Sequence, residues 1–271
     1  MPRPPLLYWP IKLLLAEPVL TAVYRPWVRG LENVPRQGPA ILASNHLSMA
    51  DPVFLPTVVE RRVTFIAKAD LWRGGGVRGR LLAGFMQGIG MLPVDRSGGR
   101  ASTAAIGAAV EVLRQGELFG IYPEGTRSPD GRLYRGRTGV ARIALESGAP
   151  VIPVAMIGTE QLRRPGKLLP HVRRVGMVIG EPMDFSRYAG RADDAFVVRS
   201  VTDEIMYAIQ ALSRQDYVDS YPERSALRTA LAQGTGVAVP EPETGRGPGG
   251  RAAPPEPTPT PEPEPDTPGA G

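Results

Sequence analysis

The chain has 271 residues, of which 42% are hydrophobic and 22% are charged, so it is long enough to bury one large core or two small ones. It contains no cysteine, which excludes disulfide bonds, thiolate catalysis and zinc or iron–sulfur centres held by cysteine. Its formal net charge is +5, and this basic balance favours anionic partners such as nucleic acid, phosphorylated metabolites or an anionic membrane.

Residues 1–28 are predicted to form an amphipathic helical segment that lies in a membrane interface. Apolar residues recur there at alternating spacings of three and four, as on one face of a helix. They are Leu6, Trp9, Leu13, Ala16, Leu20, Val23 and Trp27. Pro10 and Pro18 are expected to bend or interrupt the helix, and charged residues leave no apolar run near the ~18 residues that span a bilayer. The alternative is a helix packed on the domain's own core.

Residues 29–232 alternate short apolar runs with helical stretches, which predicts one α/β domain with a mixed, largely parallel sheet flanked by helices. The expected strands are 40–43, 63–67, 91–94, 118–122, 151–156 and 172–179. The expected helices lie near 50–60, 78–87, 100–114, 138–147 and 194–214. In such a sheet the active site gathers at the carboxyl ends of the strands.

Residues 233–271 are predicted to be a disordered tail. They hold 11 Pro and 8 Gly in 39 residues, with almost no apolar side chain after Val239. Six acidic residues and two arginines give this tail a net charge of −4, which leaves +9 on residues 1–232. The sequence does not indicate what partners the tail has.

His46 and Asp51 form the candidate catalytic pair. Both follow the first predicted strand, at the point where a helix is expected to begin. A neutral imidazole can take a proton from an alcohol, and a carboxylate on its other nitrogen fixes the tautomer. Backbone N–H groups near Ser48 to Asp51 are expected to stabilise a developing oxyanion. The pattern predicts attack by a hydroxyl group.

Three later strands are predicted to deliver cationic and polar groups to the same edge. Lys68 follows the strand at 63–67 and Arg96 follows the strand at 91–94. After the strand at 118–122 comes a turn with Glu124, Gly125, Thr126 and Arg127. Glycine allows a backbone turn to approach an anion closely, and arginine matches phosphate oxygens with its forked donors. These residues indicate chemistry on a phosphorylated alcohol.

Simpler interpretations apply to several of these charged residues. Arg96 can form a surface ion pair with Asp95, and Glu124 can pair with Arg127 to hold the loop. The basic cluster that follows can be a solvated face or can contact an anionic ligand; it contains Arg132, Arg135 and Arg137. The second histidine, His171, has no acidic residue at a useful spacing and is predicted to be structural.

Four ordered blocks resemble those of the glycerolipid acyltransferases, and within them the 1-acylglycerol-3-phosphate (lysophosphatidate) acyltransferases. The blocks are Asn45 to Asp51, Gly90 to Arg96, Tyr122 to Ser128 and Val151 to Val154, and the resemblance covers about residues 28–185. Tyr122 stands where the family usually has phenylalanine.

The resemblance implies direct acyl transfer from acyl-coenzyme A or an acyl carrier protein to the free hydroxyl of 1-acylglycerol-3-phosphate, without a metal or cofactor. It implies that His46 is the general base and Asp51 its partner. Arg96 would hold the acceptor phosphate, with a secondary phosphate role for Lys68. The turn residues Glu124, Gly125, Thr126 and Arg127 would bind the acceptor.

Other acceptors remain open, namely another lysophospholipid, glycerol 3-phosphate or a glycolipid. A different class, a non-catalytic adaptor for membranes or nucleic acid, also fits the basic charge. Nucleic acid is disfavoured as a partner, because aromatic residues make up 6% of the chain and are not interleaved with the arginines. The expected location is peripheral, on the cytoplasmic face of a membrane with anionic lipids.

Overall fold

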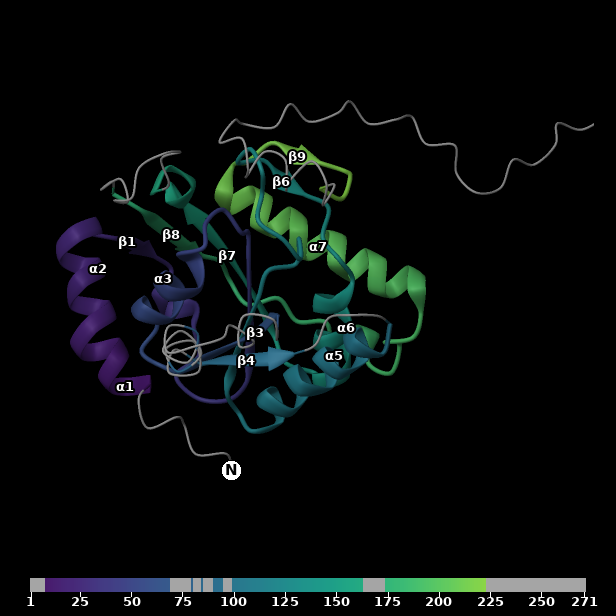
Figure 1. Ribbon diagram of the computed structural model, residues 1–271. Helices are drawn as coiled ribbons and strands as arrows, with labels where there is room; N and C mark the ends of the chain where they lie inside the picture. The colour runs from purple at the N-terminus through teal and green to yellow at the C-terminus, as the bar shows by residue number, and fades with distance from the viewer. Residues whose placement is uncertain are drawn as a thin grey trace, which may run out of the picture. The chain divides into compact units, whose positions relative to one another are not determined.

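The computed structural model describes residues 8–68, 79, 84, 90–94, 99–162 and 174–222. Its centre is a seven-stranded sheet in the order β1-β8-β7-β2-β5-β3-β4 (Figure 1). The strands are β1 (Trp27–Arg29), β2 (Ala40–Ser44), β3 (Val63–Lys68), β4 (Met91–Val94), β5 (Leu118–Ile121), β7 (Val151–Ile157) and β8 (Gly176–Ile179). Every neighbouring pair is parallel except β7 with β8. The predicted mixed, largely parallel sheet in a single α/β domain is therefore confirmed.

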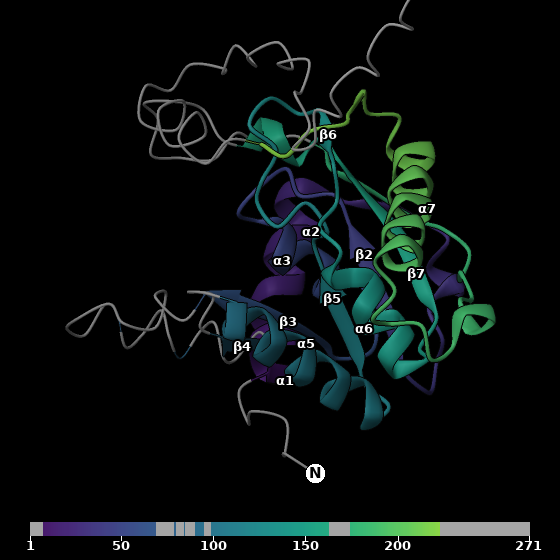
Figure 2. The ribbon, with the colours of Figure 1, turned by 90° about the vertical axis from the view of Figure 1, so that its right-hand side faces the viewer.

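Helices cover both faces of this sheet (Figure 2). On one face lie α5 (Gly99–Arg114), α6 (Gly139–Ser147) and α7 (Ala195–Ser213). On the other lie α3 (Asp51–Val58) and the N-terminal segment, which consists of α1 (Tyr8–Pro10), the π-helix η1 (Ile11–Ala16) and α2 (Glu17–Tyr24). Short 3-10 helices are η2 (Leu31–Asn33), η4 (Thr159–Leu162) and η5 (Ser186–Tyr188).

Strand β2 shows why the central strands read as unbroken apolar runs. Ile41 and Ala43 pack into the core under α5, α6 and α7, whereas Ala40 and Leu42 pack into the core under α3. All five residues of β2 are buried. A strand covered on both faces has no polar side, so its sequence shows no alternation.

The N-terminal segment differs from the predicted apolar stripe. Tyr8, Lys12 and Leu20 are buried, whereas the expected stripe residues Trp9 and Leu13 are 40% and 51% exposed. Within residues 11–16 the π-helix η1 has i→i+5 hydrogen bonds that widen the turn, so the helical spacing of three and four does not hold through this stretch. Trp27, also expected on the helix, belongs to β1. None of the described helices is both long and apolar enough to cross a bilayer.

A second, two-stranded sheet joins distant parts of the chain. It consists of β6 (Leu133–Tyr134) and β9 (Tyr217–Val218), paired in parallel, and neither strand was predicted. The N–H of Arg135 donates to the carbonyls of Val218 and Ser220, at 3.1 and 3.2 Å. We call residues 214–221 the C-terminal strap. The expected helix at 78–87 falls almost wholly outside the described residues, as does the predicted tail.

Candidate active site

The candidate site lies at the carboxyl edge of the sheet, where β2, β5 and β3 run parallel side by side. His46 follows β2, the turn from Pro123 to Arg127 follows β5, and Lys68 is the last residue of β3. Parallel neighbours bring their carboxyl ends to one edge, and this edge is where α/β sheets bind ligands. Of the predicted groups, Arg96 and His171 fall outside the described residues.

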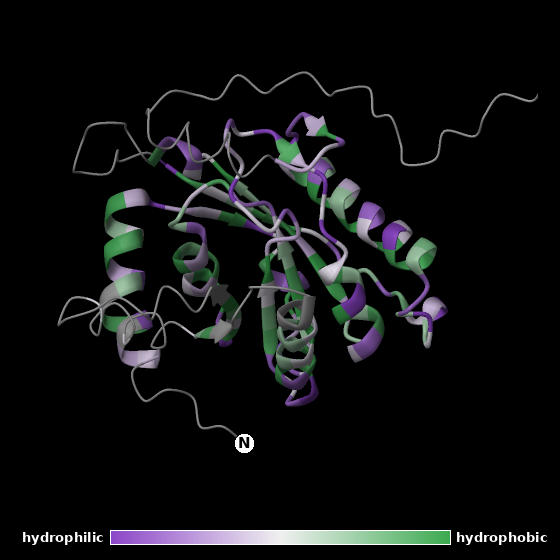
Figure 3. Cartoon of the chain, turned by 45° about the vertical axis from the view of Figure 1, so that its right-hand side comes forward, coloured by the Kyte–Doolittle hydropathy of each residue, from purple (hydrophilic) through white to green (hydrophobic). Residues whose placement is uncertain are grey.

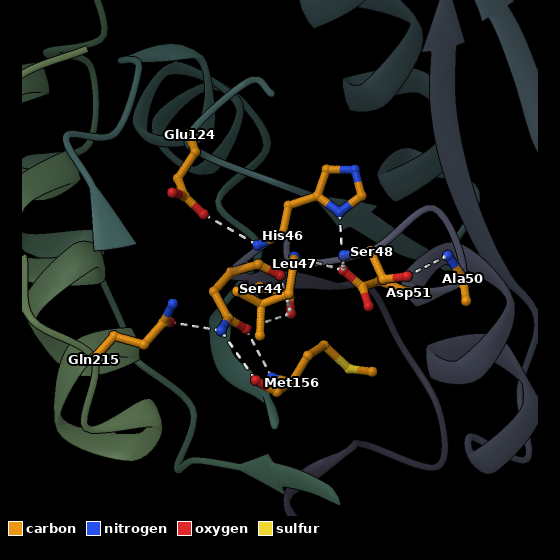
Figure 4. A network of polar contacts seen from close by, with 10 residues as sticks. Ser44, His46, Leu47, Ser48, Ala50, Asp51, Glu124, Met156 and Gln215 are labelled. Carbon is orange, nitrogen blue, oxygen red and sulfur yellow. Dashed lines mark hydrogen bonds and ion pairs between the residues drawn. The ribbon is translucent and has the colours of Figure 1, made fainter. Parts of the chain in front are cut away.

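His46 and Asp51 meet as the sequence predicted. Nδ1 of His46 lies 2.9 Å from Oδ2 of Asp51, and the imidazole is 14% exposed while Asp51 is fully buried (Figure 4). The same carboxylate oxygen accepts the N–H of Leu47 at 2.7 Å and of Ser48 at 2.8 Å. With Nδ1 turned to a carboxylate, the neutral ring carries its proton there and offers Nε2 as a proton acceptor.

These contacts change the expectation for the oxyanion donors. The N–H of Ser48 is used by Asp51, and that of Ala50 donates to Oγ of Ser48 at 3.3 Å. The N–H of Asp51 donates to the carbonyl of Ser48. These three groups thus stabilise the turn itself and do not face an oxyanion in this conformation. For the N–H of Met49, the fourth group in this range, the oxyanion role stays a prediction.

Glu124 is fully buried behind the histidine and contacts backbone. Oε1 accepts the N–H of His46 and Oε2 accepts the N–H of Tyr134, each at 3.0 Å. Burial raises the pKa of the Glu124 carboxyl to about 8, against the pull of the two backbone hydrogen bonds. Glu124 was predicted to bind the acceptor; the contacts seen instead fix the backbone that carries the catalytic pair, which indicates a positioning role.

The turn after Glu124 is the exposed part of the site. Gly125 has φ +74°, a conformation that glycine adopts without strain. Thr126 and Arg127 are partly buried. The N–H of Ser128 donates to the carbonyl of His46 at 2.7 Å, which fastens this turn to the end of β2. The acceptor-binding roles of Lys68, Arg96, Gly125, Thr126 and Arg127 stay predictions.

Tyr122 supports the imidazole from one side. Its ring stacks on His46 with centroids 4.0 Å apart and planes 17° apart, and Phe65 stacks behind it at 5.5 Å. Gly120 makes room for Phe65, since a Cβ at Gly120 would lie 2.3 Å from that ring. Burial raises the pKa of the Tyr122 phenol well above its ordinary value, and its hydroxyl has no hydrogen-bond partner among the described residues.

A polar network that sequence reasoning missed lies directly before the histidine. Asn45 is fully buried; its side chain accepts the N–H of Met156 at 2.7 Å and donates to the carbonyl of Met156 at 3.0 Å. Asn45 also donates to Oε1 of Gln215 at 2.7 Å, and Nε2 of Gln215 donates to the carbonyl of Gly131 at 2.6 Å. Gln215 belongs to the C-terminal strap, 170 residues from Asn45, so no local pattern could reveal it.

Among the described residues, no group of three or more histidine, aspartate or glutamate side chains is placed to hold a metal ion. What the site offers is a histidine with a free ring nitrogen, an oriented carboxylate and an exposed glycine turn. Together with the largely parallel sheet, these features define an α/β domain whose site suits general-base activation of a hydroxyl group.

Residues 25–157 match the family model described as Acyltransferase. The 1-acyl-sn-glycerol-3-phosphate acyltransferase of Bacillus subtilis is 29% identical over 160 residues, which are 58% of this chain and 73% of that protein. The chloroplastic enzyme LPAT1 of Arabidopsis thaliana is 29% identical over 60% of this chain, and the match covers 45% of that relative.

The crystal structure of the 1-acyl-sn-glycerophosphate (LPA) acyltransferase PlsC from Thermotoga maritima is similar in fold. It superposes with a TM-score of 0.56 and 28% identity, covering 75% of this chain and 78% of that one. The resemblance to the glycerolipid acyltransferases is thereby confirmed. The chain spans about half the length of the Brassica napus and Arabidopsis thaliana relatives that it matches, at 47% and 45%.

Proposed function

We propose that the protein transfers a fatty acyl group from acyl-coenzyme A, or an acyl carrier protein, to the free hydroxyl of 1-acylglycerol-3-phosphate, giving phosphatidate. The observation that carries the proposal is the His46–Asp51 pair, 2.9 Å apart, at the carboxyl edge beside the Gly125 turn. The names of the relatives supply the substrate class, and the family match supplies the reaction type.

His46 acts as the general base in this proposal. Nε2 takes the hydroxyl proton of the acceptor, and the oxygen attacks the thioester carbonyl to form a tetrahedral intermediate. The carbon–sulfur bond then breaks, and the thiolate leaves with the proton from the imidazolium. Asp51 stabilises the charged ring, because its carboxylate faces Nδ1. General-base assistance of this kind contributes ~10²–10⁴ in rate.

No acyl-enzyme is needed, because the thioester is already activated. Ser48, the nearest hydroxyl in the sequence motif, accepts the N–H of Ala50 and lies two residues from the base. Arg96 and Arg127 bind the acceptor phosphate in this proposal, with Lys68 in a secondary role, and the reaction proceeds in one ternary complex.

The proposal is tested by thiol release from acyl-coenzyme A with and without lysophosphatidate, together with detection of phosphatidate. We expect His46→Ala to lower kcat/KM by about 10²-fold or more while lysophosphatidate still binds. His171→Ala is the matched control, and it should leave the rate unchanged. Near-normal acyl transfer by His46→Ala would contradict the assignment of His46 as the general base. An acceptor panel with glycerol 3-phosphate, other lysophospholipids and a glycolipid decides the acceptor.

We further propose that the protein works at the surface of a membrane that contains anionic lipids, on its cytoplasmic face. Support comes from the +9 charge of residues 1–232 and from exposed apolar side chains on the N-terminal segment. These are Trp9, Leu13, Leu14, Val19 and Val23. Apolar side chains of this kind insert at the boundary between head groups and acyl chains.

A further inference from the structure

The three arginines that follow the Gly125 turn have different surroundings. Nε of Arg132 lies 2.7 Å from Asp130, and Nη1 of Arg135 lies 3.5 Å from Asp219. Arg137 is exposed and, among the residues that the structure describes, forms no ion pair with a carboxylate. The basic cluster therefore contains two paired cations and one whose charge is uncompensated.

Arg137 is nevertheless held in place along its whole length. Its N–H donates to the carbonyl of Pro123 at 2.8 Å, and the carbonyl of Gly136 before it accepts Nη1 of Arg199 at 2.8 Å. Its side chain crosses Gly125 so closely that a Cβ there would lie 2.8 Å from Cδ of Arg137. The guanidinium carbon then sits 5.1 Å from the ring centroid of Tyr221, in the C-terminal strap.

This arrangement suits an anion. A guanidinium that stacks on an aromatic face keeps the N–H groups along its edge available, and these match the oxygens of a phosphate. A side chain that is already ordered loses less conformational entropy when it binds. Arg137 also lies against the turn whose Glu124 carboxyl group accepts the N–H of His46, so an anion bound there would contact the turn that carries this positioning residue.

We propose that Arg137, presented by Tyr221, binds a phosphomonoester group of a substrate. The inference rests on the proposed acyl transfer, in which two substrates carry such a group: the lysophosphatidate acceptor, and coenzyme A through its 3′-phosphate. It adds a residue that no motif in the sequence specified, and it gives the C-terminal strap, which lies outside the matched residues 25–157, a role in substrate binding.

Equilibrium binding tests the proposal without turnover. Calorimetry is done on the His46→Ala protein with two ligand pairs: hexanoyl-lysophosphatidate against hexanoylglycerol, and coenzyme A against dephospho-coenzyme A. Adding Arg137→Gln should weaken one phosphomonoester about tenfold and leave its phosphate-free counterpart unchanged. The pair that responds identifies the substrate that Arg137 binds.

Three further variants complete the test. Arg132→Gln is the matched control and should change each affinity less than twofold, because that cation is paired with Asp130 at 2.7 Å and lies over Tyr134, whereas Arg135 shares the Tyr221 ring at 5.9 Å. Tyr221→Leu should lose about threefold in the same ligand pair, and Tyr221→Phe should lose nothing. Equal effects of Arg137→Gln and Arg132→Gln, or a loss that extends to the phosphate-free ligands, would overturn the proposal. A lower Tm without a change in affinity would make the Arg137–Tyr221 contact purely structural.

The result is separable from that of the proposed function. Suppose the unmodified protein transfers no acyl group, yet Arg137→Gln selectively weakens the binding of one phosphomonoester ligand. The proposed binding site is then supported and the proposed reaction is contradicted. If acyl transfer occurs and Arg137→Gln binds every ligand with normal affinity, the proposed reaction is supported and the binding role of Arg137 is contradicted.

Discussion

Glu124 connects the catalytic histidine to the rest of the fold through a single side chain. Its two oxygens accept backbone N–H groups that are 88 residues apart in sequence, at His46 and Tyr134. Because burial raises the pKa of Glu124 from 4.5 to about 8, the folded protein keeps a proton there that the unfolded chain has lost. Glu124 therefore makes the folded state less stable as the pH rises from 4.5 to 8.

Replacing this carboxyl should remove that pH dependence. We expect the free energy of unfolding of the natural protein to fall across this window by up to about 1.4 kcal/mol per pH unit more than that of Glu124→Gln. The amide of Glu124→Gln also places an NH₂ donor against one of the two backbone N–H donors, at His46 or Tyr134. One of these hydrogen bonds is then lost and the backbone at His46 is held less firmly, so kcat should fall as well. Urea unfolding at pH 5 and pH 8 measures the difference, with exposed Glu111→Gln as the control. Parallel slopes in both proteins would contradict the argument.

At the residue scale, the sequence revealed the parts of the site that are local. His46 and Asp51 are five positions apart at a strand-to-helix turn, so spacing and residue type were sufficient to pair them. The partners of Glu124 could not be predicted, because a backbone N–H has no sequence signature. The role of Gln215 could not be predicted either. Its contacts with Asn45 and Gly131 form only when the end of α7 packs near β2 and the Gly131 loop.

The C-terminal strap is the element on which the geometry of the site depends most. Gln215 bonds to Asn45, the residue before the base, and to Gly131 in the loop after the Gly125 turn. The residue before it, Arg214, has φ +57° and ends α7 in the left-handed conformation that often terminates a helix. The strap thus aligns the base with the segment predicted to bind the acceptor.

Gln215→Ala should test this alignment. It removes both hydrogen bonds and leaves the buried Asn45 amide with one partner fewer, so unfolding should become about 1–3 kcal/mol easier. We expect kcat to fall by a larger factor than the acceptor KM changes, because the base moves while the arginines remain. Gln115→Ala, an exposed glutamine after α5, is the control. Loss of stability with an unchanged kcat would show that the strap is structural only.

At the element scale, the core strands were predictable and the short strands were not. β2, β3, β4, β5 and β7 have four or more residues, most of them apolar, and each appeared where the sequence placed it. β1, β6 and β9 have two or three residues, and pairing with a partner strand rather than intrinsic preference creates them. The π-helix likewise has no period in the sequence that distinguishes it from an α-helix.

Considered as a whole, the molecule carries exposed apolar side chains on the N-terminal segment, which packs on the face of the sheet opposite α7. Figure 3 colours much of this segment as hydrophobic. Lys12 anchors that segment, because its buried Nζ donates to the carbonyl of Val59 at the end of α3. The inward face is thus fixed to the domain, and the outward face is free to meet lipid.

A matched pair of substitutions tests this orientation. Leu14 is 79% exposed on the N-terminal segment and Phe196 is 80% exposed on α7. We expect Leu14→Asp to weaken binding to vesicles of equal phosphatidylcholine and phosphatidylglycerol by about tenfold, and Phe196→Asp to have no effect. Sedimentation with the vesicles measures the partition. Equal losses from the two variants would place the membrane contact elsewhere or nowhere.

Gln215 and Tyr221 also bear on biosynthesis. During translation, β2, α3 and β5 emerge long before the strap, so a nascent chain can pack its core while the amide of Asn45 and the guanidinium of Arg137 still await their partners. Alignment of the base is consequently among the last events of synthesis. A chain cut short before residue 215 would still contain His46 and Asp51, but it would lack the glutamine that connects Asn45 to the Gly131 loop.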